Sequence, residues 1–342
     1  MTVLLGRNGA GKSALLGALE RLGSYARGGA ERAFGPPPYS LGFMRSRGYG
    51  DIAATSFEVD LGFGVERYRY RLALAERAGH VEVDEERLVR ASGDDVAVWS
   101  AAARPASGTI LRPDAPDPSV ERVASHLRSV RIFDLDPRAI ERPSEEGDSG
   151  VKRDGHGVGA SLGKLQEEAP ERFADIEERV RRLRPGTKRL RVWGGAAGKF
   201  LWGIEDQRGQ EWIYPAPLLS WGDRMLVGIL CVLFAAEAGS VVGLEEIDRG
   251  FHPSRYQAVV ELLSEAAYQG VGGRGPLQIM ATSHSPSLVS HFQDRLDDLR
   301  LVSRTAGGAT TVAAMDEEVR RRLGEEKTSA PIGEVWAMGL LD

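Results

Sequence analysis

The sequence predicts an α/β fold with a mixed sheet, and three observations carry this prediction. An apolar strand, a glycine-rich loop and a helix pattern follow one another at the start of the chain. Strand and helix patterns alternate again between residues 223 and 282, as parallel sheets require. Residues 55–99, in contrast, have the alternation of antiparallel strands. We therefore expect a sheet-forming core that is split by a long insertion.

The first element is the strand around Val3, which leads into GRNGAGKS at residues 6–13 and then into a leucine-rich helix face. This loop fits the pattern G-x-x-x-x-G-K-[ST], in which glycines let backbone N–H groups surround a phosphate. Lys12 should reach the β- and γ-phosphates, and the Ser13 hydroxyl should ligate Mg²⁺. A plain glycine-rich turn is the alternative, which the flanking strand and helix disfavour. The residues expected to bind the cofactor are Gly6, Arg7, Asn8, Gly9, Ala10, Gly11, Lys12, Ser13 and Ala14.

The insertion has two parts. A Gly- and Pro-rich loop at residues 28–50 precedes the antiparallel strands, and residues 101–118 have the composition of a surface connection. From residue 119 to Pro185 the apolar spacing is helical. We expect a split ATP-binding core at residues 1–30 and 190–342, a loop and antiparallel β subdomain at 31–118, and a helical insertion at 119–189.

The core resumes after Pro185 with strands and then alternating units. The elements expected here are strands at 190–193, 200–205 and 211–214 with a turn at 207–209, a buried helix at 223–238, a strand at 241–244, a helix at 253–269, and strands at 277–282, 299–302 and 310–312.

The second half of an active site follows the strand at 241–244, which ends in Glu245 and Glu246. The ends of parallel strands deliver such carboxylates beside the phosphate loop. Glu245 would hold Mg²⁺, directly or through water, and Glu246 would orient an attacking water. A surface acidic pair is the alternative. His284, in the phrase TSHSP after the next strand, would contact the γ-phosphate and sense its loss.

The phrase LSWGDR at residues 219–224 precedes the buried helix. Ser220 and Gly222 at a helix N-terminus could form another anion site. The alternative is a simple cap, in which Ser220 or Asp223 accepts a backbone hydrogen bond.

The order of these motifs resembles the ABC class of ATPases, and among them the SMC, RecF and OLD-like branch. The likeness covers the first 25 residues and about residues 215–290. It implies a P-loop NTPase head of the ABC type that binds ATP and Mg²⁺. It also implies a homodimer around two ATP molecules, each held by one phosphate loop and by Ser220 and Gly222 of the other subunit. Glu245 matches the family's Mg²⁺ carboxylate, Glu246 its catalytic carboxylate and His284 its switch histidine.

The resemblance implies a slowly hydrolysing ATPase in DNA repair, DNA maintenance or defence against foreign DNA, with a separate effector or nuclease chain. The family also has a glutamine between the phosphate loop and the insertion, whereas the first glutamine here is Gln166. This favours a second reading, a nucleotide-gated regulatory subunit with little turnover. The long insertion and the Glu245–Glu246 pair disfavour a third reading, a transporter ATPase subunit.

A basic cluster bears on DNA binding. Such a cluster could neutralise phosphates, or it could be a solvated helix end balanced by nearby glutamates. Its members are Arg179, Arg181, Arg182, Arg184, Lys188, Arg189 and Arg191.

Composition sets the remaining expectations. The net charge of −5 indicates no global attraction to nucleic acid. The single cysteine, Cys231, lies in an apolar run and should be buried, so structural disulfides are not expected. The longest apolar run, residues 225–236, is too short to span a bilayer, and no signal peptide precedes the first strand. We expect a cytoplasmic chain with no membrane partner.

Overall fold

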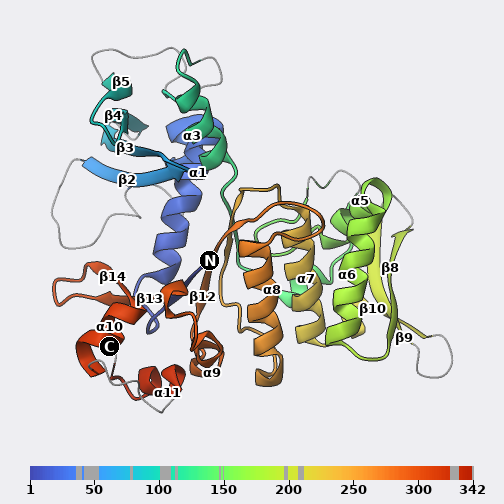
Figure 1. Ribbon diagram of the computed structural model, residues 1–342. Helices are drawn as coiled ribbons and strands as arrows, with labels where there is room; N and C mark the ends of the chain where they lie inside the picture. The colour runs from blue at the N-terminus through green and yellow to red at the C-terminus, as the bar shows by residue number, and fades with distance from the viewer. Residues whose placement is uncertain are drawn as a thin grey trace. The chain divides into compact units, whose positions relative to one another are not determined.

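The computed structural model describes residues 1–35, 41, 54–77, 80–100, 109–111, 115–145, 148, 150–195, 199–206, 212–323 and 331–340. The chain forms two compact units. The first unit consists of Met1–Ser13 and Arg131–Asp342, and the second is Ala14–Val130 (Figure 1). The helix α1 (Lys12–Phe34) starts in the first unit and continues into the second.

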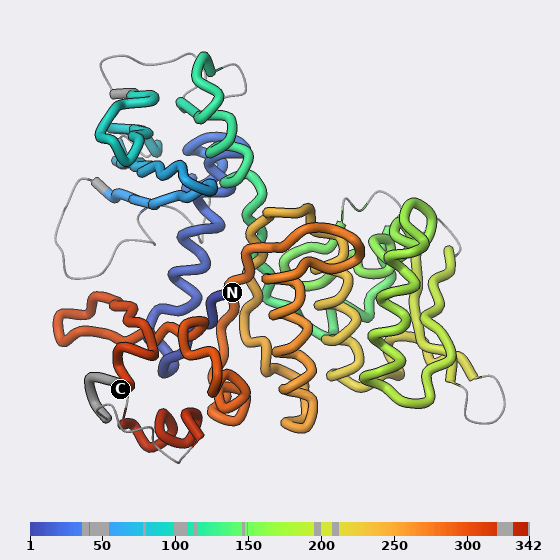
Figure 2. Tube along the Cα trace, viewed as in Figure 1, coloured from blue at the N-terminus to red at the C-terminus, as the bar shows by residue number. Residues whose placement is uncertain are grey.

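The first unit is built on a six-stranded mixed sheet, which confirms the predicted fold class. Its order is β14-β13-β1-β12-β11-β6, so the N-terminal strand pairs with strands from the last third of the chain (Figure 2). β1, β12, β11, β6 and β13 are parallel, and β14 is antiparallel to β13. Consequently the carboxyl ends of the five parallel strands share one edge of the sheet. The strands are β1 (Thr2–Leu5), β6 (Arg131–Phe133), β11 (Val241–Leu244), β12 (Gln278–Ser283), β13 (Leu299–Arg304) and β14 (Thr310–Ala314).

Three helices of the first unit, α5 (Val158–Glu168), α6 (Pro170–Leu183) and α7 (Trp221–Ala235), are stabilised by burial of their apolar side chains. α7 is apolar on all sides, and nearly every side chain between Gly222 and Phe234 is buried. A helix of this kind has to lie inside a core. α6 packs against both α5 and α7 through Phe173, Ile176 and Val180. The predicted burial of Cys231 in α7 is confirmed, and burial raises the pKa of its thiol to about 12.

A second, four-stranded sheet lies in the same unit. β9 (Lys199–Asp206) pairs antiparallel with β8 (Thr187–Gly195), β10 (Trp212–Pro215) and β7 (Ser144–Glu145). The predicted turn at 207–209 lies outside the described residues. The remaining elements of this unit are α4 (Pro137–Ile140), η1 (Ala216–Leu218), η2 (Pro253–Arg255), α8 (Tyr256–Tyr268), α9 (Pro286–Val289), η3 (Ser290–Phe292), η4 (Leu296–Asp298), α10 (Met315–Leu323) and α11 (Ile332–Ala337).

The second unit combines an antiparallel sheet with helices. The predicted strands are present as β2 (Ala54–Phe63), β3 (Glu66–Arg77), β4 (His80–Arg90) and β5 (Asp95–Ser100). Along β3, Tyr68, Tyr70 and Leu72 are buried while the residues between them are exposed, so one face packs on the core. That core includes residues of α1 and of α3 (Pro118–Arg128).

A buried carboxylate joins the parts of this core. Glu86 is fully buried and accepts hydrogen bonds from the Tyr25 hydroxyl (2.9 Å), the Tyr70 hydroxyl (2.7 Å), the Thr109 hydroxyl (2.9 Å) and the Ile110 backbone N–H (2.8 Å). It thereby ties α1, β3 and the segment 109–111 to β4. Burial raises the pKa of Glu86, and the donors oppose this rise without cancelling it.

The structure differs from the expected boundaries in two places. The expected helical insertion at 119–189 contains β6, which pairs with β11 as the edge strand of the central sheet. Accordingly residues 131–189 belong to the first unit. The first helix also runs on to Phe34, with non-helical dihedrals at Gly28 and Gly29, because Ala33 and Phe34 are buried in the second core.

Because its pKa is raised, folded Glu86 holds a proton that the unfolded chain releases above about pH 4.5. The resulting stability is full below that pH and is lost as the pH rises through the folded pKa. Glu86→Gln, which stays neutral, should therefore gain in free energy of unfolding relative to wild type as the pH rises above about 4.5. Urea unfolding of both chains at each pH measures the difference, and a pH-independent difference would contradict a raised pKa.

Candidate nucleotide-binding site

The phosphate loop lies where the sequence predicts it, between β1 and α1. Lys12 is buried, and its Nζ donates hydrogen bonds to the backbone oxygens of Gly6 (2.7 Å) and Arg7 (3.1 Å). Burial lowers the pKa of Lys12, against the charges of Glu246 and Asp248. Ser13 and Ala14 are exposed in the first turn of α1, where backbone N–H groups have no helical partner. The loop thus presents donors at the carboxyl edge of the sheet.

Two of the loop glycines are required by close packing against β13 and β14. A Cβ at Gly6 would lie 2.2 Å from the backbone oxygen of Val302. A Cβ at Gly11 would lie 2.3 Å from Thr310 Oγ1, whose hydroxyl donates to the Ala10 oxygen at 3.0 Å. The hairpin of β13 and β14 therefore packs directly against the phosphate loop.

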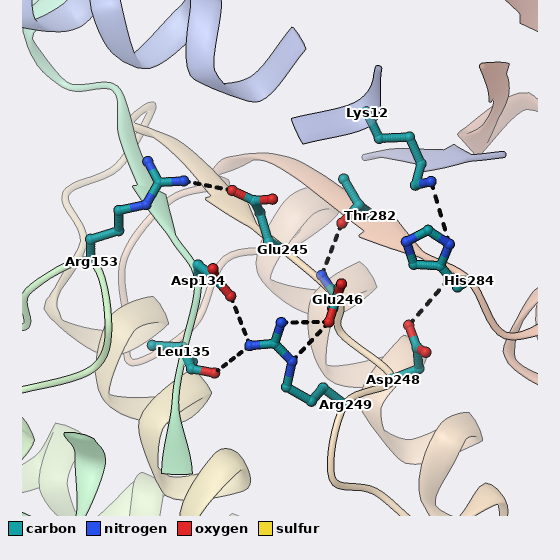
Figure 3. Close-up of polar contacts among 10 residues, drawn as sticks. All are labelled: Lys12, Asp134, Leu135, Arg153, Glu245, Glu246, Asp248, Arg249, Thr282 and His284. Carbon is teal, nitrogen blue, oxygen red and sulfur yellow. Dashed lines mark hydrogen bonds and ion pairs between the residues drawn. The ribbon is translucent and has the colours of Figure 1, made fainter. Parts of the chain in front are cut away.

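Glu245 directly follows β11. Its backbone N–H donates to the Phe133 oxygen (2.8 Å), and its largely buried carboxylate pairs with Arg153 at 2.6 Å (Figure 3). The hydroxyl of Ser13 and the carboxylate of Glu245 are the hard oxygen ligands that Mg²⁺ prefers, and Mg²⁺ usually takes only one or two protein ligands beside phosphates and water. These residues therefore fit a magnesium site completed by a nucleotide.

Glu246 has the most constrained backbone of the site. Its φ of 48° is the only positive value outside glycine in the part of the chain that the structure describes. Its N–H donates to Thr282 Oγ1 at 2.9 Å, and Arg249 holds its carboxylate at 2.8 and 2.5 Å (Figure 3). Strained residues of this kind cluster at functional sites.

His284 follows β12 and connects the two halves of the site. Its Nδ1 lies 3.4 Å from Lys12 Nζ, and its backbone N–H donates to Asp248 Oδ1 at 3.4 Å. Figure 3 shows Lys12, His284 and Asp248 in one chain of contacts beside Glu246. Residues 12, 245–249 and 284, which are far apart in the sequence, thus share one edge of the sheet.

Ser220 and Gly222 lie at the start of α7. Ser220 is exposed and caps α7, since its hydroxyl accepts from the Asp223 N–H at 3.2 Å. A Cβ at Gly222 would lie 3.0 Å from the Gly250 oxygen, so the start of α7 packs on the loop that follows Glu246.

Three site residues escaped the sequence analysis, namely Asp134, Arg153 and Arg249. Asp134 follows β6, and it binds Arg249 Nη1 at 2.8 Å. A signal for it existed, because a short apolar strand ends in an acid at Asp134 just as another does at Glu245. The arginines carry no such signal, since only the tertiary fold brings them to Glu245 and Glu246.

The basic cluster at the end of α6 is balanced by acids. Arg179 pairs with Asp175 and Glu265, Arg181 and Arg182 pair with Glu178, and Arg184 pairs with Asp206 and Asp223. Lys188, Arg189 and Arg191 all face the buried carboxylate of Glu205, whose pKa Lys188 lowers most. This arrangement favours the balanced alternative over a free phosphate-binding patch.

None of the helices in the described ranges is long and apolar enough to cross a membrane.

Comparisons with solved structures give distant likenesses. The Smc head domain with an extended coiled coil bound to the C-terminal domain of ScpA, derived from Pyrococcus furiosus, is 12% identical, with a TM-score of 0.49. That alignment covers 94% of this chain and 92% of that chain. A structure described as structural biochemistry of ATP-driven dimerization and DNA stimulated activation of SMC ATPases is 10% identical, with a TM-score of 0.34. That second alignment covers 49% of this chain and 99% of the other chain. No curated protein matches the sequence.

The comparison with family models identifies the family of the chain. Residues 1–290 match the model described as "AAA domain, putative AbiEii toxin, Type IV TA system". The matched residues include the phosphate loop, Ser220, Gly222, Glu245, Glu246 and His284. This match confirms the resemblance to P-loop ATPases, and the chain belongs to this family of AAA domains.

Proposed function

We propose that this chain binds Mg·ATP at the phosphate loop, hydrolyses it slowly, and dimerises around two ATP molecules. The observation that carries the proposal is the meeting of Lys12, Glu246 and His284 at the carboxyl edge of β1, β11 and β12. Ligands bind at this edge in open α/β sheets.

The loop and α1 would bind the phosphates of ATP. Lys12 Nζ now contacts the backbone oxygens of Gly6 and Arg7, and these hydrogen bonds would be exchanged for phosphate oxygens. The N-terminus of α1 adds free donors and partial positive charge. Because Lys12 is already buried, its charge would act on the phosphates with little screening by water.

Ser13 and Glu245 would hold Mg²⁺, which supplies positive charge that stabilises the phosphates when it is bound. The carboxylate of Glu245 would have to share its Oε1 with Arg153 or release it. Glu246 would orient the attacking water and accept its proton. His284, through its contact with Lys12, would respond to the γ-phosphate.

Dimerisation would complete each site from the partner. Ser220 is exposed at the start of α7, where its hydroxyl and the free N–H groups could face the partner's nucleotide. For biological role we propose DNA repair, DNA maintenance or defence, acting with a separate effector or nuclease chain. The description of the family as a putative AbiEii toxin supports the defence role.

A nucleotide-gated regulatory subunit with little turnover is the second candidate. The observation that favours it is the ion pair between Arg153 and Glu245, because this cation competes with Mg²⁺ for the carboxylate. The glutamine that the resemblance leads us to expect is also missing before the insertion, since Gln166 lies in α5.

Lys12→Ala should weaken ATP binding by about 100-fold or more, because it removes a charge-assisted contact to the phosphates. Titration calorimetry with ATP measures the affinity. Lys164→Ala is the matched control, because Lys164 is exposed on α5 and pairs only with Glu168 in the described structure. Equal affinity of the Lys12→Ala chain and the wild type would contradict the site.

Ser220→Arg should leave ATP binding by the single chain nearly intact and should block dimerisation and turnover. A mixture of Lys12→Ala and Ser220→Arg chains should regain activity, since one composite site in a mixed dimer joins an intact loop to an intact Ser220. ATPase assays of the mixture against each variant alone test this. A mixture without recovered activity would remove the support for shared sites.

Glu246→Gln should keep Mg·ATP bound and slow hydrolysis about 100-fold or more, because the amide keeps the size of the carboxylate and loses its basicity. This variant should accumulate as an ATP-dependent dimer on size exclusion, while wild type returns to monomer as ATP is consumed. Glu245→Gln should instead weaken Mg²⁺ binding and dimerisation together. If Glu245→Gln and Glu246→Gln had the same effect on Mg²⁺ binding, dimerisation and hydrolysis, the separate roles proposed for the two glutamates would be wrong.

A further inference from the structure

We propose that Arg249 is the positioning residue of Glu246, and that Asp134 in turn orients Arg249. Arg249 holds one carboxylate oxygen of Glu246, so the other is presented to the attacking water. This inference rests on the proposed function, because it concerns the base of the same hydrolytic site. It adds two residues that neither the motifs nor the family match assign.

The backbone of Glu246 is fixed from β12. Thr282 accepts from the Glu246 N–H through Oγ1 (2.9 Å) and from the Ile247 N–H through its backbone oxygen (3.0 Å). Both contacts hold the turn in which Glu246 has a φ of 48°, a conformation that non-glycine residues rarely adopt. The position of the Glu246 Cα is therefore set by contacts that do not involve the side chain of Glu246.

The side chain of Glu246 is fixed by Arg249. Arg249 Nε (2.8 Å) and Nη2 (2.5 Å) both donate to Oε2 of Glu246 (Figure 3). Its Oε1 makes no hydrogen bond with the part of the chain that the structure describes. The two carboxylate oxygens thus differ in their hydrogen bonds: Oε2 accepts two from Arg249, and Oε1 is the one available to a water molecule.

Arg249 is itself held at its other end. Its Nη1 donates to Asp134 Oδ1 (2.8 Å) and to the Leu135 backbone oxygen (3.3 Å). These groups follow β6, which pairs with β11 through Phe133 and Leu244. A planar guanidinium can make both sets of contacts at once, whereas a lysine ammonium cannot reproduce this fork. Burial by itself would lower the pKa of Arg249, but the hydrogen bonds and charges of Glu246 and Asp134 together raise it.

The consequence for hydrolysis is geometric. As the water oxygen bonds to the γ-phosphorus, its proton passes to Glu246 Oε1, and the bond from the γ-phosphorus to the bridging β–γ oxygen breaks to release ADP. A base with a fixed oxygen performs this step better than a mobile carboxylate, because small displacements of reacting groups cost large factors in rate. The opposite role, in which Arg249 holds Glu246 inactive, predicts the opposite change in rate.

The test compares Arg249→Ala, Arg249→Lys and Asp134→Asn with wild type. Arg249→Ala should lower kcat by about 10- to 100-fold and leave the KM for ATP and the calorimetric affinity within about 2-fold. The variant should accumulate as an ATP-dependent dimer. Arg249→Lys and Asp134→Asn should retain intermediate activity. Guanidinium chloride below denaturing concentration should restore part of the activity of Arg249→Ala. The control is Arg304→Ala, whose side chain is exposed on β13, and the same salt should not raise its activity.

In the Glu246→Gln background, Arg249→Ala should change kcat by less than about 2-fold, because residues that act as a unit are not additive. An unchanged or raised kcat for Arg249→Ala alone would overturn the inference, and so would a full additional loss in the double variant. A wild-type chain that binds no ATP would contradict the proposed function itself. Wild type that hydrolyses ATP while Arg249→Ala keeps its kcat would contradict only the role of Arg249. Matching thermal melting curves establish that each variant is folded.

Discussion

The parallel pairing of β1 and β11 with β12 is the constraint on which the candidate site depends. The register aligns Leu5 with Ser283 and Leu244 with Ala281, so all three strands end at one edge. The residue types that follow them are a phosphate loop, a histidine and two glutamates. β6 adds Asp134 at the same edge through its pairing with β11. Without this sheet order, residues separated by more than 200 positions would not meet.

Charge balance is the second property of the site. The buried ammonium of Lys12 is held by backbone oxygens and lies near His284, while each glutamate has an arginine partner. Such pairing is expected for Lys12 and Glu245, which are removed from water, whereas Glu246 and Arg249 are partly exposed. Binding of anionic phosphates and a divalent cation would therefore exchange partners within an existing network rather than create charges in an apolar environment. Arg153 and Arg249 would be affected differently, because Arg153 pairs with Glu245, the proposed Mg²⁺ ligand, and Arg249 pairs with Glu246, the proposed base.

The sequence predicted the strand ends that carry the motif residues more closely than it predicted the bounds of the insertion. The motifs that precede and follow β1, β11 and β12 indicated Lys12, Glu245, Glu246 and His284, because a strand followed by a functional residue is a local pattern. β6 was missed because it has three residues between two helices, where the apolar spacing of Val123 and Leu127 continues a helical pattern. The roles of Arg153 and Arg249 depend on contacts across more than one strand, which no local pattern encodes. The role of Ser220 stays a prediction, since it concerns contact with a second copy of the chain.

We propose that this edge of the sheet binds and hydrolyses Mg·ATP. A crystal structure of the Glu246→Gln chain grown with Mg²⁺ and ATP tests it most directly. We expect the triphosphate within the loop of residues 6–13, the γ-phosphate against Lys12 and His284, and Mg²⁺ on Ser13 and Glu245 with Arg153 displaced. We also expect Ser220 of a second copy against the same nucleotide. A nucleotide bound elsewhere, or a loop that stays empty at saturating ATP, would contradict the account.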